Sequence, residues 1–226
     1  MSELQDQVVI VTGAAGALGA AVVDHFANQG AKLAQLDVVP IDNAHYSDTC
    51  DLTSYEDCRE AVTKILGQFG SVAVLANIAG GFTMGDAVHE TSADTWNFMM
   101  GLNAQSVLNM ARAVVPAMIN QGHGKIVNIG ARAGLRGAPN MAAYSASKSV
   151  VIRLTESLAD EVKAQGINVN CVLPSIIDTE RNRTDMPDAD FSSWVQPAQL
   201  AAVIGFLASS AADPIHGAAL PVEGLS

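Results

Sequence analysis

Segments with strand and helix patterns alternate from one end of the chain to the other. The β-branched run Val8–Thr12 leads through a glycine-rich loop into a helical pattern that reaches about Gln29. Further strand patterns cover residues 32–37, 46–50, 72–76, 125–129, 167–173 and 218–222. Helical patterns cover 55–69, 143–165 and 197–209, and residues 92–121 form one helix or two. Such alternation favours a parallel sheet with right-handed crossovers. The sequence therefore predicts one α/β domain over residues 1–226, a doubly wound parallel sheet of about seven strands with helices on both faces.

The composition agrees with such a sheet and narrows the classes of partner. Hydrophobic residues make up 49% of the chain and charged residues only 15%, which suits a sheet that is buried on both faces. The net charge is −11 and the pI is about 4.6. An acidic surface argues against nucleic acids and anionic membranes as partners. We therefore expect a small-molecule ligand.

The cysteines, histidines and N-terminus point to no metal site and no export signal. Cys50, Cys58 and Cys171 are odd in number and show no C-x-x-C spacing, and the five histidines are scattered. Neither a disulfide framework nor a metal site is indicated. The first seven residues lack the basic-then-apolar pattern of a signal peptide, and no apolar run is long enough to span a bilayer. We expect a cytoplasmic protein.

The glycine-rich loop Thr12-Gly-Ala-Ala-Gly-Ala-Leu-Gly19 joins the first strand pattern to the first helix pattern. Glycines at this junction allow a tight turn and let a pyrophosphate approach backbone N–H groups and a helix N-terminus. The alternative is a turn that only packs the helix on the strand. The residues that we expect to contact a dinucleotide here are Gly13, Ala15, Gly16, Leu18 and Gly19.

A carboxylate at the end of the second strand, Asp37, lies 24 residues beyond Gly13. It can accept hydrogen bonds from the adenosine ribose hydroxyls, and it would repel a 2′-phosphate. No Arg or Lys flanks it. NAD(H) is therefore favoured over NADP(H).

Two other strand ends carry residues that could complete a nucleotide site. Asp51 and Leu52 follow the third strand, where a carboxylate could meet the adenine amino group. The fourth is followed by Asn77-Ile-Ala-Gly80, of which Asn77, Ala79 and Gly80 could cover the adenosine. Asp and Asn also favour ordinary turns.

Two stretches, residues 80–91 and 174–196, lack clear periodicity. Long irregular segments in a compact domain are usually functional or mobile. Both should lie at the carboxyl ends of strands, where open α/β sheets bind ligands.

Tyr144 and Lys148 stand at i and i+4 on one face of the helix predicted over residues 143–165. An ammonium group there can stabilise a phenolate and lower the pKa of the tyrosine towards neutrality. A tyrosine tuned in this way is a general acid or base. On an arbitrary helix the same spacing would more often be a solvated pair, but here it follows a nucleotide loop.

These motifs together resemble the short-chain dehydrogenase/reductase family, with its Rossmann-type fold, over essentially the whole chain. The matching features, in the family's order and spacing, are the glycine loop, Asp51-Leu52, Asn77-x-Ala-Gly80, Asn103, Tyr144-x-x-x-Lys148 and Pro174…Thr179.

The resemblance implies a role for each catalytic and nicotinamide-binding residue. Tyr144 would give or take the proton, and Lys148 would hold the nicotinamide ribose and lower the tyrosine pKa. Asn103 would anchor a water in the proton relay, and Ile177 and Thr179, after Pro174, would contact the carboxamide. Members usually form dimers or tetramers through the helices over 92–121 and 143–165, so a homodimer or homotetramer is implied.

The chain departs from the family pattern most strongly at Ala131. About thirteen residues before Tyr144 the family has a catalytic serine, and Ser145 and Ser147 are at the wrong spacing to replace it. Smaller departures are Ala17 and Ser175, where glycine is usual, and Ile78, where a second asparagine is usual.

One branch of the family, the dihydropteridine reductases, has similar departures. The resemblance covers Gly16-Ala-Leu-Gly19, Leu36-Asp-Val-Val39, Ala79-Gly-Gly-Phe82 and the alanine at 131. It is strongest in residues 186–194, Met-Pro-Asp-Ala-Asp-Phe-Ser-Ser-Trp. Phe191 and Trp194 in this loop could equally anchor it to the core.

The missing serine is chemically compatible with a quinonoid dihydropterin. In a ketone reductase the serine hydroxyl stabilises the carbonyl oxygen, whereas a conjugated, electron-poor ring spreads the incoming charge over its own heteroatoms. The resemblance therefore implies an NADH-dependent reductase in which Tyr144 donates the proton, beside Ala131 and a flat wall formed by Phe82. Phe82 could equally pack only within its loop.

Two other functions stay open. One is a generic short-chain alcohol dehydrogenase or 3-oxoacyl reductase that lacks the serine or replaces it with water. The other is a non-catalytic NAD(H)-binding sensor, against which Asn103, Tyr144 and Lys148 argue.

Overall fold

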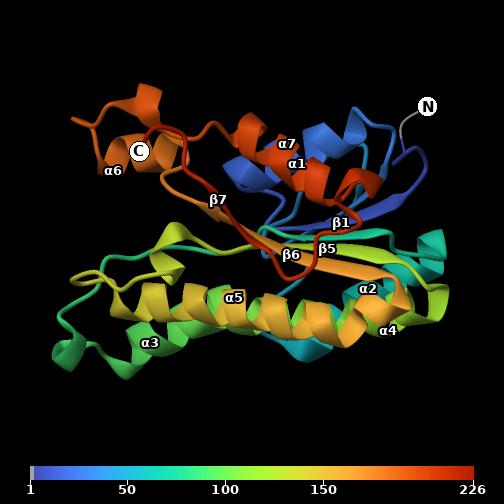
Figure 1. Ribbon diagram of the computed structural model, residues 1–226, viewed down its shortest axis with the longest axis horizontal. Helices are drawn as coiled ribbons and strands as arrows, with labels where there is room; N and C mark the ends of the chain where they lie inside the picture. The colour runs from blue at the N-terminus through green and yellow to red at the C-terminus, as the bar shows by residue number, and fades with distance from the viewer. Residues whose placement is uncertain (1–2) are drawn as a thin grey trace.

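The computed structural model describes residues 3–226, in which a single parallel sheet of seven strands separates two layers of helices (Figure 1). The strand order is β3-β2-β1-β4-β5-β6-β7. The strands are β1 (Val8–Thr12), β2 (Lys32–Asp37), β3 (Tyr46–Thr49), β4 (Val74–Asn77), β5 (Gly124–Ile129), β6 (Ile167–Pro174) and β7 (Ala219–Val222). This confirms the predicted doubly wound α/β fold.

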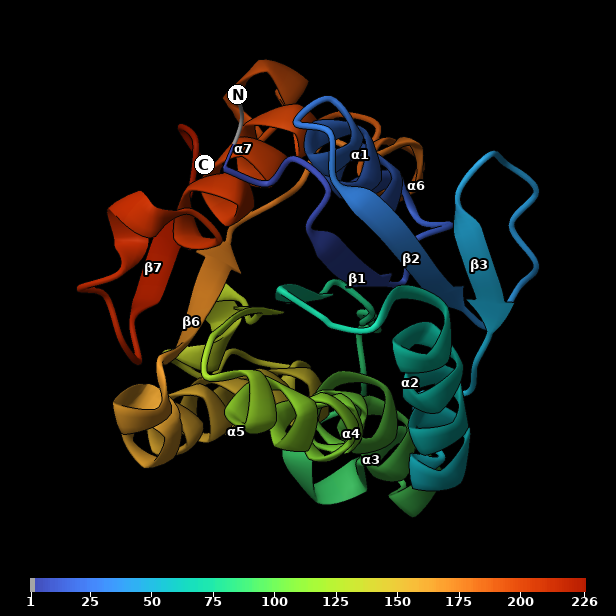
Figure 2. The same cartoon turned by 90° about the vertical axis from the view of Figure 1, so that its right-hand side faces the viewer.

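The helices cover both faces of the sheet, as Figure 2 shows: α1 and α7 lie on one side, and α2, α4 and α5 on the other. The α-helices are α1 (Ala17–Ala27), α2 (Tyr55–Phe69), α3 (Ala93–Met100), α4 (Ser106–Gln121), α5 (Ala142–Val162), α6 (Glu180–Asp185) and α7 (Pro197–Leu207). Phe26 and Ile204 belong to the core on the first side, and Ile65 and Met110 to the core on the second. Because apolar side chains cover both faces, the central strands β1, β4, β5 and β6 are almost entirely buried, whereas the edge strands β3 and β7 are partly exposed.

The sequence left open whether residues 92–121 form one helix or two. They form α3 and α4, joined by a π-helical turn over Gly101–Gln105. Such turns often occur at functional sites, and this one carries Asn103. The predicted irregular segments do contain short helical elements, since Val88–Glu90 and Phe191–Ser193 form 3₁₀ turns and 180–185 forms α6.

The strand order reverses between β1 and β4. From β1 the chain builds outward to β3, returns to β4 beside β1, and then builds to β7 in the opposite direction. The loops after these two adjacent strands therefore diverge and leave a crevice at the carboxyl edge of the sheet.

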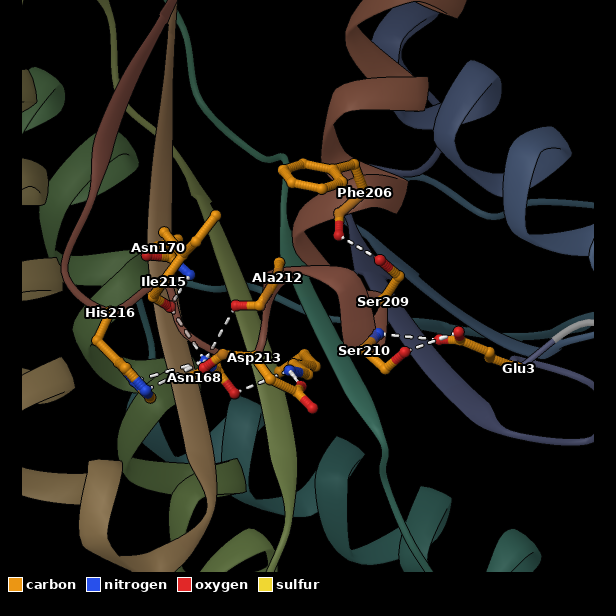
Figure 3. A network of polar contacts seen from close by, with 11 residues as sticks. Glu3, Asn168, Asn170, Phe206, Ser209, Ser210, Ala212, Asp213, Ile215 and His216 are labelled. Carbon is orange, nitrogen blue, oxygen red and sulfur yellow. Dashed lines mark hydrogen bonds and ion pairs between the residues drawn. The ribbon is translucent and has the colours of Figure 1, made fainter.

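A polar network at the opposite, amino edge fixes the C-terminal segment (Figure 3). Asn168 donates to the carbonyl oxygen of Asp213 at 2.8 Å, and Lys125 donates to the Asn168 side chain at 2.8 Å while it pairs with Asp213. The Glu3 carboxylate accepts from the backbone N–H and hydroxyl of Ser210 at 2.9 and 2.7 Å. These contacts hold the chain between α7 and β7 against β5 and β6.

Within residues 3–226, no helix combines the length and apolar character needed to cross a membrane, and no group of three or more His, Cys, Asp or Glu side chains could hold a metal ion. The three thiols are buried and free.

Candidate active site

A cavity of about 1030 Å³ lies where the loops follow the carboxyl ends of the strands. Most of the residues predicted for the site line it: Gly13, Ala15, Gly16, Leu18, Gly19, Asp37, Asp51, Leu52, Ala79, Gly80, Phe82, Tyr144, Lys148, Pro174, Ile177 and Thr179. Asn77, Asn103 and Ala131 are not among the lining residues. The tertiary structure thus brings the separate motifs to one cavity and places three of the predicted residues behind its wall.

The glycine loop requires glycine at two of its positions. Gly13 has a φ of +64°, and a Cβ there would lie 2.7 Å from the Cα of Ala79. A Cβ at Gly19 would lie 2.0 Å from the carbonyl oxygen of Gly13. The following helix α1 starts at its N-cap Gly16 without a side-chain cap and without an acidic residue in its first turn. An uncapped helix N-terminus beside a close-packed glycine turn fits the pyrophosphate of a nicotinamide dinucleotide.

The two carboxylates at the nucleotide end are both oriented by hydrogen bonds. Asp37 accepts from the backbone N–H of Ala15 at 3.0 Å, so the end of β2 is tied to the glycine loop. Asp51 accepts from the N–H and hydroxyl of Thr53 at 2.9 and 2.7 Å. Both carboxylates line the cavity in positions that suit hydrogen bonding to an adenosine.

Asn77 does not cover a ligand. Its side chain is buried and donates to Asn128 at 2.8 Å, and Asn128 donates in turn to Thr155 at 2.9 Å. The predicted adenosine contact at Asn77 is therefore wrong, because its amide is used to brace β4, β5 and α5. The next residues do reach the cavity: the Thr12 hydroxyl accepts from the N–H groups of Ile78 and Ala79 at 3.0 and 3.2 Å.

Tyr144 and Lys148 project from α5 into the cavity. The Lys148 ammonium is buried and donates to the carbonyl oxygen of Ile129 at 2.8 Å. The rings of Tyr144 and Phe82 form a T-shaped pair, with centroids 5.0 Å apart and planes at 84°. The predicted aromatic wall thus lies directly against the predicted proton donor.

The pKa values of this pair do not follow the expectation from the sequence. Burial raises the pKa of Tyr144 to about 12, and burial lowers the pKa of Lys148 to about 8. The predicted lowering of the tyrosine pKa is wrong for this structure, because desolvation of the phenol dominates. At neutral pH Tyr144 is therefore protonated, which is the form that can donate a proton.

Asn103 braces the wall of the cavity from within the π-helical turn. Its side-chain oxygen accepts from the N–H of Gly81 at 2.9 Å, and its amide donates to the Gly81 carbonyl and to Ser147 at 3.0 Å each. Ser147 then donates to the backbone carbonyl of Tyr144 at 2.7 Å. Asn103 therefore fixes the loop after β4 relative to α5, and its predicted role in anchoring a water stays a prediction.

Ala131 follows β5 and is buried, outside the cavity lining. Ser147 cannot replace the missing hydroxyl because its own is already bonded, and the buried Ser145 hydroxyl has no hydrogen-bond partner within residues 3–226. Three lining hydroxyls, those of Thr53, Ser175 and Thr179, are hydrogen-bonded to neighbouring protein groups. Thr53 and Ser175 donate their hydroxyl protons to protein acceptors, whereas Thr179 only accepts a hydrogen bond. The lining hydroxyls whose protons the described residues leave for a substrate are therefore those of Tyr144 and Thr179.

The loop over residues 186–194 does not line the cavity. Trp194 is buried and meets the Phe191 ring at a centroid distance of 4.8 Å, and the Arg183 guanidinium lies 4.9 Å from the Phe191 centroid. Arg183 also pairs with Asp178 at 2.5 and 2.7 Å, and together with Gln196 it lowers the pKa of Asp178 to about 2. The structure therefore supports the anchoring role for both aromatic residues.

Sequence reasoning missed the walls that enclose the substrate end of the cavity. Arg181, Asn182 and Asp185 come from α6, which is too short to show a helical period. The irregular segment 174–196 was the available signal for this wall. Other lining residues not predicted are Ala17, Val38, Thr53, Ile78, Gly81, Asn97, Phe98, Gly101, Leu102, Ile129, Gly130 and Ser175.

Comparison with known proteins agrees with this fold. The short chain dehydrogenase family matches residues 7–190. The chain is 31% identical to 2-dehydro-3-deoxy-D-gluconate 5-dehydrogenase of Dickeya dadantii, over 98% of this chain and 95% of that protein, and 29% identical to the 3-oxoacyl-[acyl-carrier-protein] reductase FabG of Vibrio cholerae, over 98% and 97%. The solved structure of the aldohexose dehydrogenase of Thermoplasma acidophilum, in ligand-free form, matches with a TM-score of 0.91 and 28% identity, over 99% of this chain and 95% of that one.

The chain therefore belongs to the short-chain dehydrogenase family and is an NAD(P)-dependent oxidoreductase.

Proposed function

We propose that this enzyme uses NADH to reduce a conjugated, electron-poor ring, with a quinonoid dihydropterin as the leading candidate. The observation that carries the proposal is the contact of Tyr144 with the aromatic wall of Phe82, together with alanine at position 131, where the family has its serine. A flat substrate fits beside Phe82 and needs one proton rather than two hydroxyl contacts.

The chemistry requires one hydride and one proton. When NADH is bound, its nicotinamide supplies the hydride. Tyr144, protonated at neutral pH, donates a proton to a ring nitrogen, and the two-electron reduction yields the tetrahydropterin. Loss of an oxyanion donor costs a ketone reductase about 2.7–4 kcal/mol in the transition state. A ring that delocalises the incoming charge over its heteroatoms avoids much of that cost.

The preference for NADH rests on Asp37. Its carboxylate is held at the end of β2 by the N–H of Ala15. The lysine and arginine side chains that line the cavity are Lys148 and Arg181, which come from α5 and α6 rather than from this end. A 2′-phosphate would therefore meet a carboxylate without a compensating cation.

A second candidate is favoured by the names of the relatives. The two sequence relatives above are a sugar-acid dehydrogenase and an acyl carrier protein reductase, which makes a ketone or alcohol the competing substrate. A scaffold of this kind that lacks its serine should act weakly on ketones.

Steady-state assays with NADH or NADPH test both candidates. We expect turnover of freshly generated quinonoid dihydropterin, with NADH preferred, and little turnover of ketones and acyl thioesters. Absence of dihydropterin turnover above background would contradict the proposal. Strong gain of ketone reduction in Ala131→Ser would favour the second candidate, and binding of NADH without turnover of any substrate would indicate a sensor.

Two further expectations belong to the same proposal. Exposed apolar side chains on α4, Leu108 and Ile119, are 38% and 43% exposed and would be covered in the homodimer or homotetramer that the family resemblance implies. A monomer in sedimentation velocity would contradict this. A cytoplasmic location with no nucleic-acid or membrane partner is the other expectation, and cell fractionation tests the location.

A further inference from the structure

Most charged side chains that line the cavity are committed to protein partners. Asp37 accepts from the glycine loop, Asp51 accepts from the threonine two residues later, and Lys148 donates to the end of β5. The two others, Arg181 and Asp185, come from α6 and pair with each other. They are the charged lining groups that a substrate can engage at the lowest cost.

The contact between Arg181 and Asp185 is loose. The guanidinium Nε lies 3.8 Å from the carboxylate across one helical turn, and the side chains are 78% and 60% exposed. An ion pair that is this exposed contributes little to stability. Both groups can therefore leave each other for a ligand that offers complementary hydrogen bonds.

The short helix that carries the pair is held firmly beneath it. Thr179 caps α6 by accepting from the N–H of Asn182, and the Asn182 side chain donates to the carbonyl of Ile177 at 2.8 Å. Arg183 is fixed by Asp178 and by the ring of Phe191, as described above. The loop over residues 186–194 thus acts through α6, because it sets the position of two cavity side chains without reaching the cavity itself.

We propose that Asp185 and Arg181 read the aminopyrimidinone edge of the substrate, an inference that rests on the proposed function. The Asp185 carboxylate accepts two parallel hydrogen bonds, from the 2-amino group and from the adjacent ring N–H. The Arg181 guanidinium donates to the neighbouring 4-oxo group. The carboxylate of Asp185 can accept from the two neighbouring donors of this edge, and the forked guanidinium of Arg181 can donate to its acceptor. Such charge-assisted hydrogen bonds are stronger than neutral ones.

Binding of pterin and lumazine tests the inference without requiring turnover. These two rings differ at position 2, where lumazine carries an oxo group in place of the amino group. Titrations that follow the ligands' own fluorescence, with the full chain saturated with NAD⁺, give both dissociation constants. We expect the wild type to prefer pterin by about tenfold or more, since removing a hydrogen bond to a charged group costs that much.

Three variants complete the test. Asp185→Asn should abolish the preference for pterin over lumazine, whereas Arg181→Gln should raise the dissociation constants of both ligands by the same factor. Asp160→Asn is the matched control and should keep the wild-type preference. It removes a carboxylate on α5 from an exposed pair with Lys163, the residue after this helix, outside the cavity lining.

Equal binding of pterin and lumazine by the wild type, or an unchanged preference in Asp185→Asn, would overturn the inference even if dihydropterin is turned over. Conversely, Asp185-dependent pterin binding without any dihydropterin turnover would uphold the recognition site and refute the proposed reaction.

Discussion

At the scale of single residues, desolvation sets the pKa values of Tyr144 and Lys148. Tyr144 lies against Phe82 and keeps its proton, while the buried Lys148 loses part of its basicity. The i, i+4 spacing predicted that the two side chains share a face of α5, and both do line the cavity. It did not reveal how deeply the tyrosine is buried, because burial depends on a phenylalanine 62 residues away in the sequence.

Tyr144→Phe should lower kcat by at least about tenfold, because it removes the proton donor and leaves the ring against Phe82. The dissociation constant of NADH, measured by fluorescence titration, should change little. Tyr46→Phe is the matched control, since Tyr46 lies on the edge strand β3 and packs on Phe69. An unchanged kcat in Tyr144→Phe would remove this residue from the mechanism.

The lowered pKa of Lys148 makes folding stability depend on pH. Between about pH 8 and 10 the unfolded chain binds a proton at this lysine that the folded chain does not, so the free energy of unfolding rises with pH. Between these pH values the free energy of unfolding of the wild type should rise by about 2 kcal/mol more than that of Lys148→Met. Urea unfolding of both proteins at pH 7.5, 9 and 10 measures the difference, and parallel pH profiles would contradict it.

At the scale of elements, the π-helical turn between α3 and α4 holds the loop after β4. The turn carries Asn103, whose side chain bonds both backbone groups of Gly81 and reaches Ser147 on α5. The sequence identified Asn103 through the family resemblance. It could not show which groups the amide contacts, because these come from three elements that only the fold brings together.

Asn103→Ala should lower the free energy of unfolding by about 1–3 kcal/mol, because it removes the hydrogen bonds that the buried Asn103 side chain makes to the half-buried backbone of Gly81 and to the buried Ser147 hydroxyl. Asn97→Ala provides the control, since Asn97 lies on the exposed side of α3 and should change stability by less than about 0.5 kcal/mol. Urea unfolding at pH 7.5 gives both values, and equal stabilities of the two variants would argue against the bracing role.

At the scale of the whole molecule, the carboxyl edge of the sheet carries the cavity and the amino edge carries the polar network that holds the C-terminal segment. The reversal of strand order between β1 and β4 opens the cavity at the carboxyl edge. At the amino edge, Asn168 and Lys125 hold the segment that leads to β7. The part of the structure that must admit ligands is therefore remote from the part that fixes the C-terminal strand.

Local periodicity and close spacing are enough to predict the fold class, the order of strands and helices, the glycine loop and the pairing of Tyr144 with Lys148 from the sequence. Which residues face the cavity depends on how the elements pack. The tertiary structure placed Asn77 in a brace within the sheet, directed Phe191 and Trp194 away from the cavity, and brought Arg181 and Asp185 into its wall. Exposure to a shared cavity depends on contacts between distant segments, and no local pattern encodes those contacts.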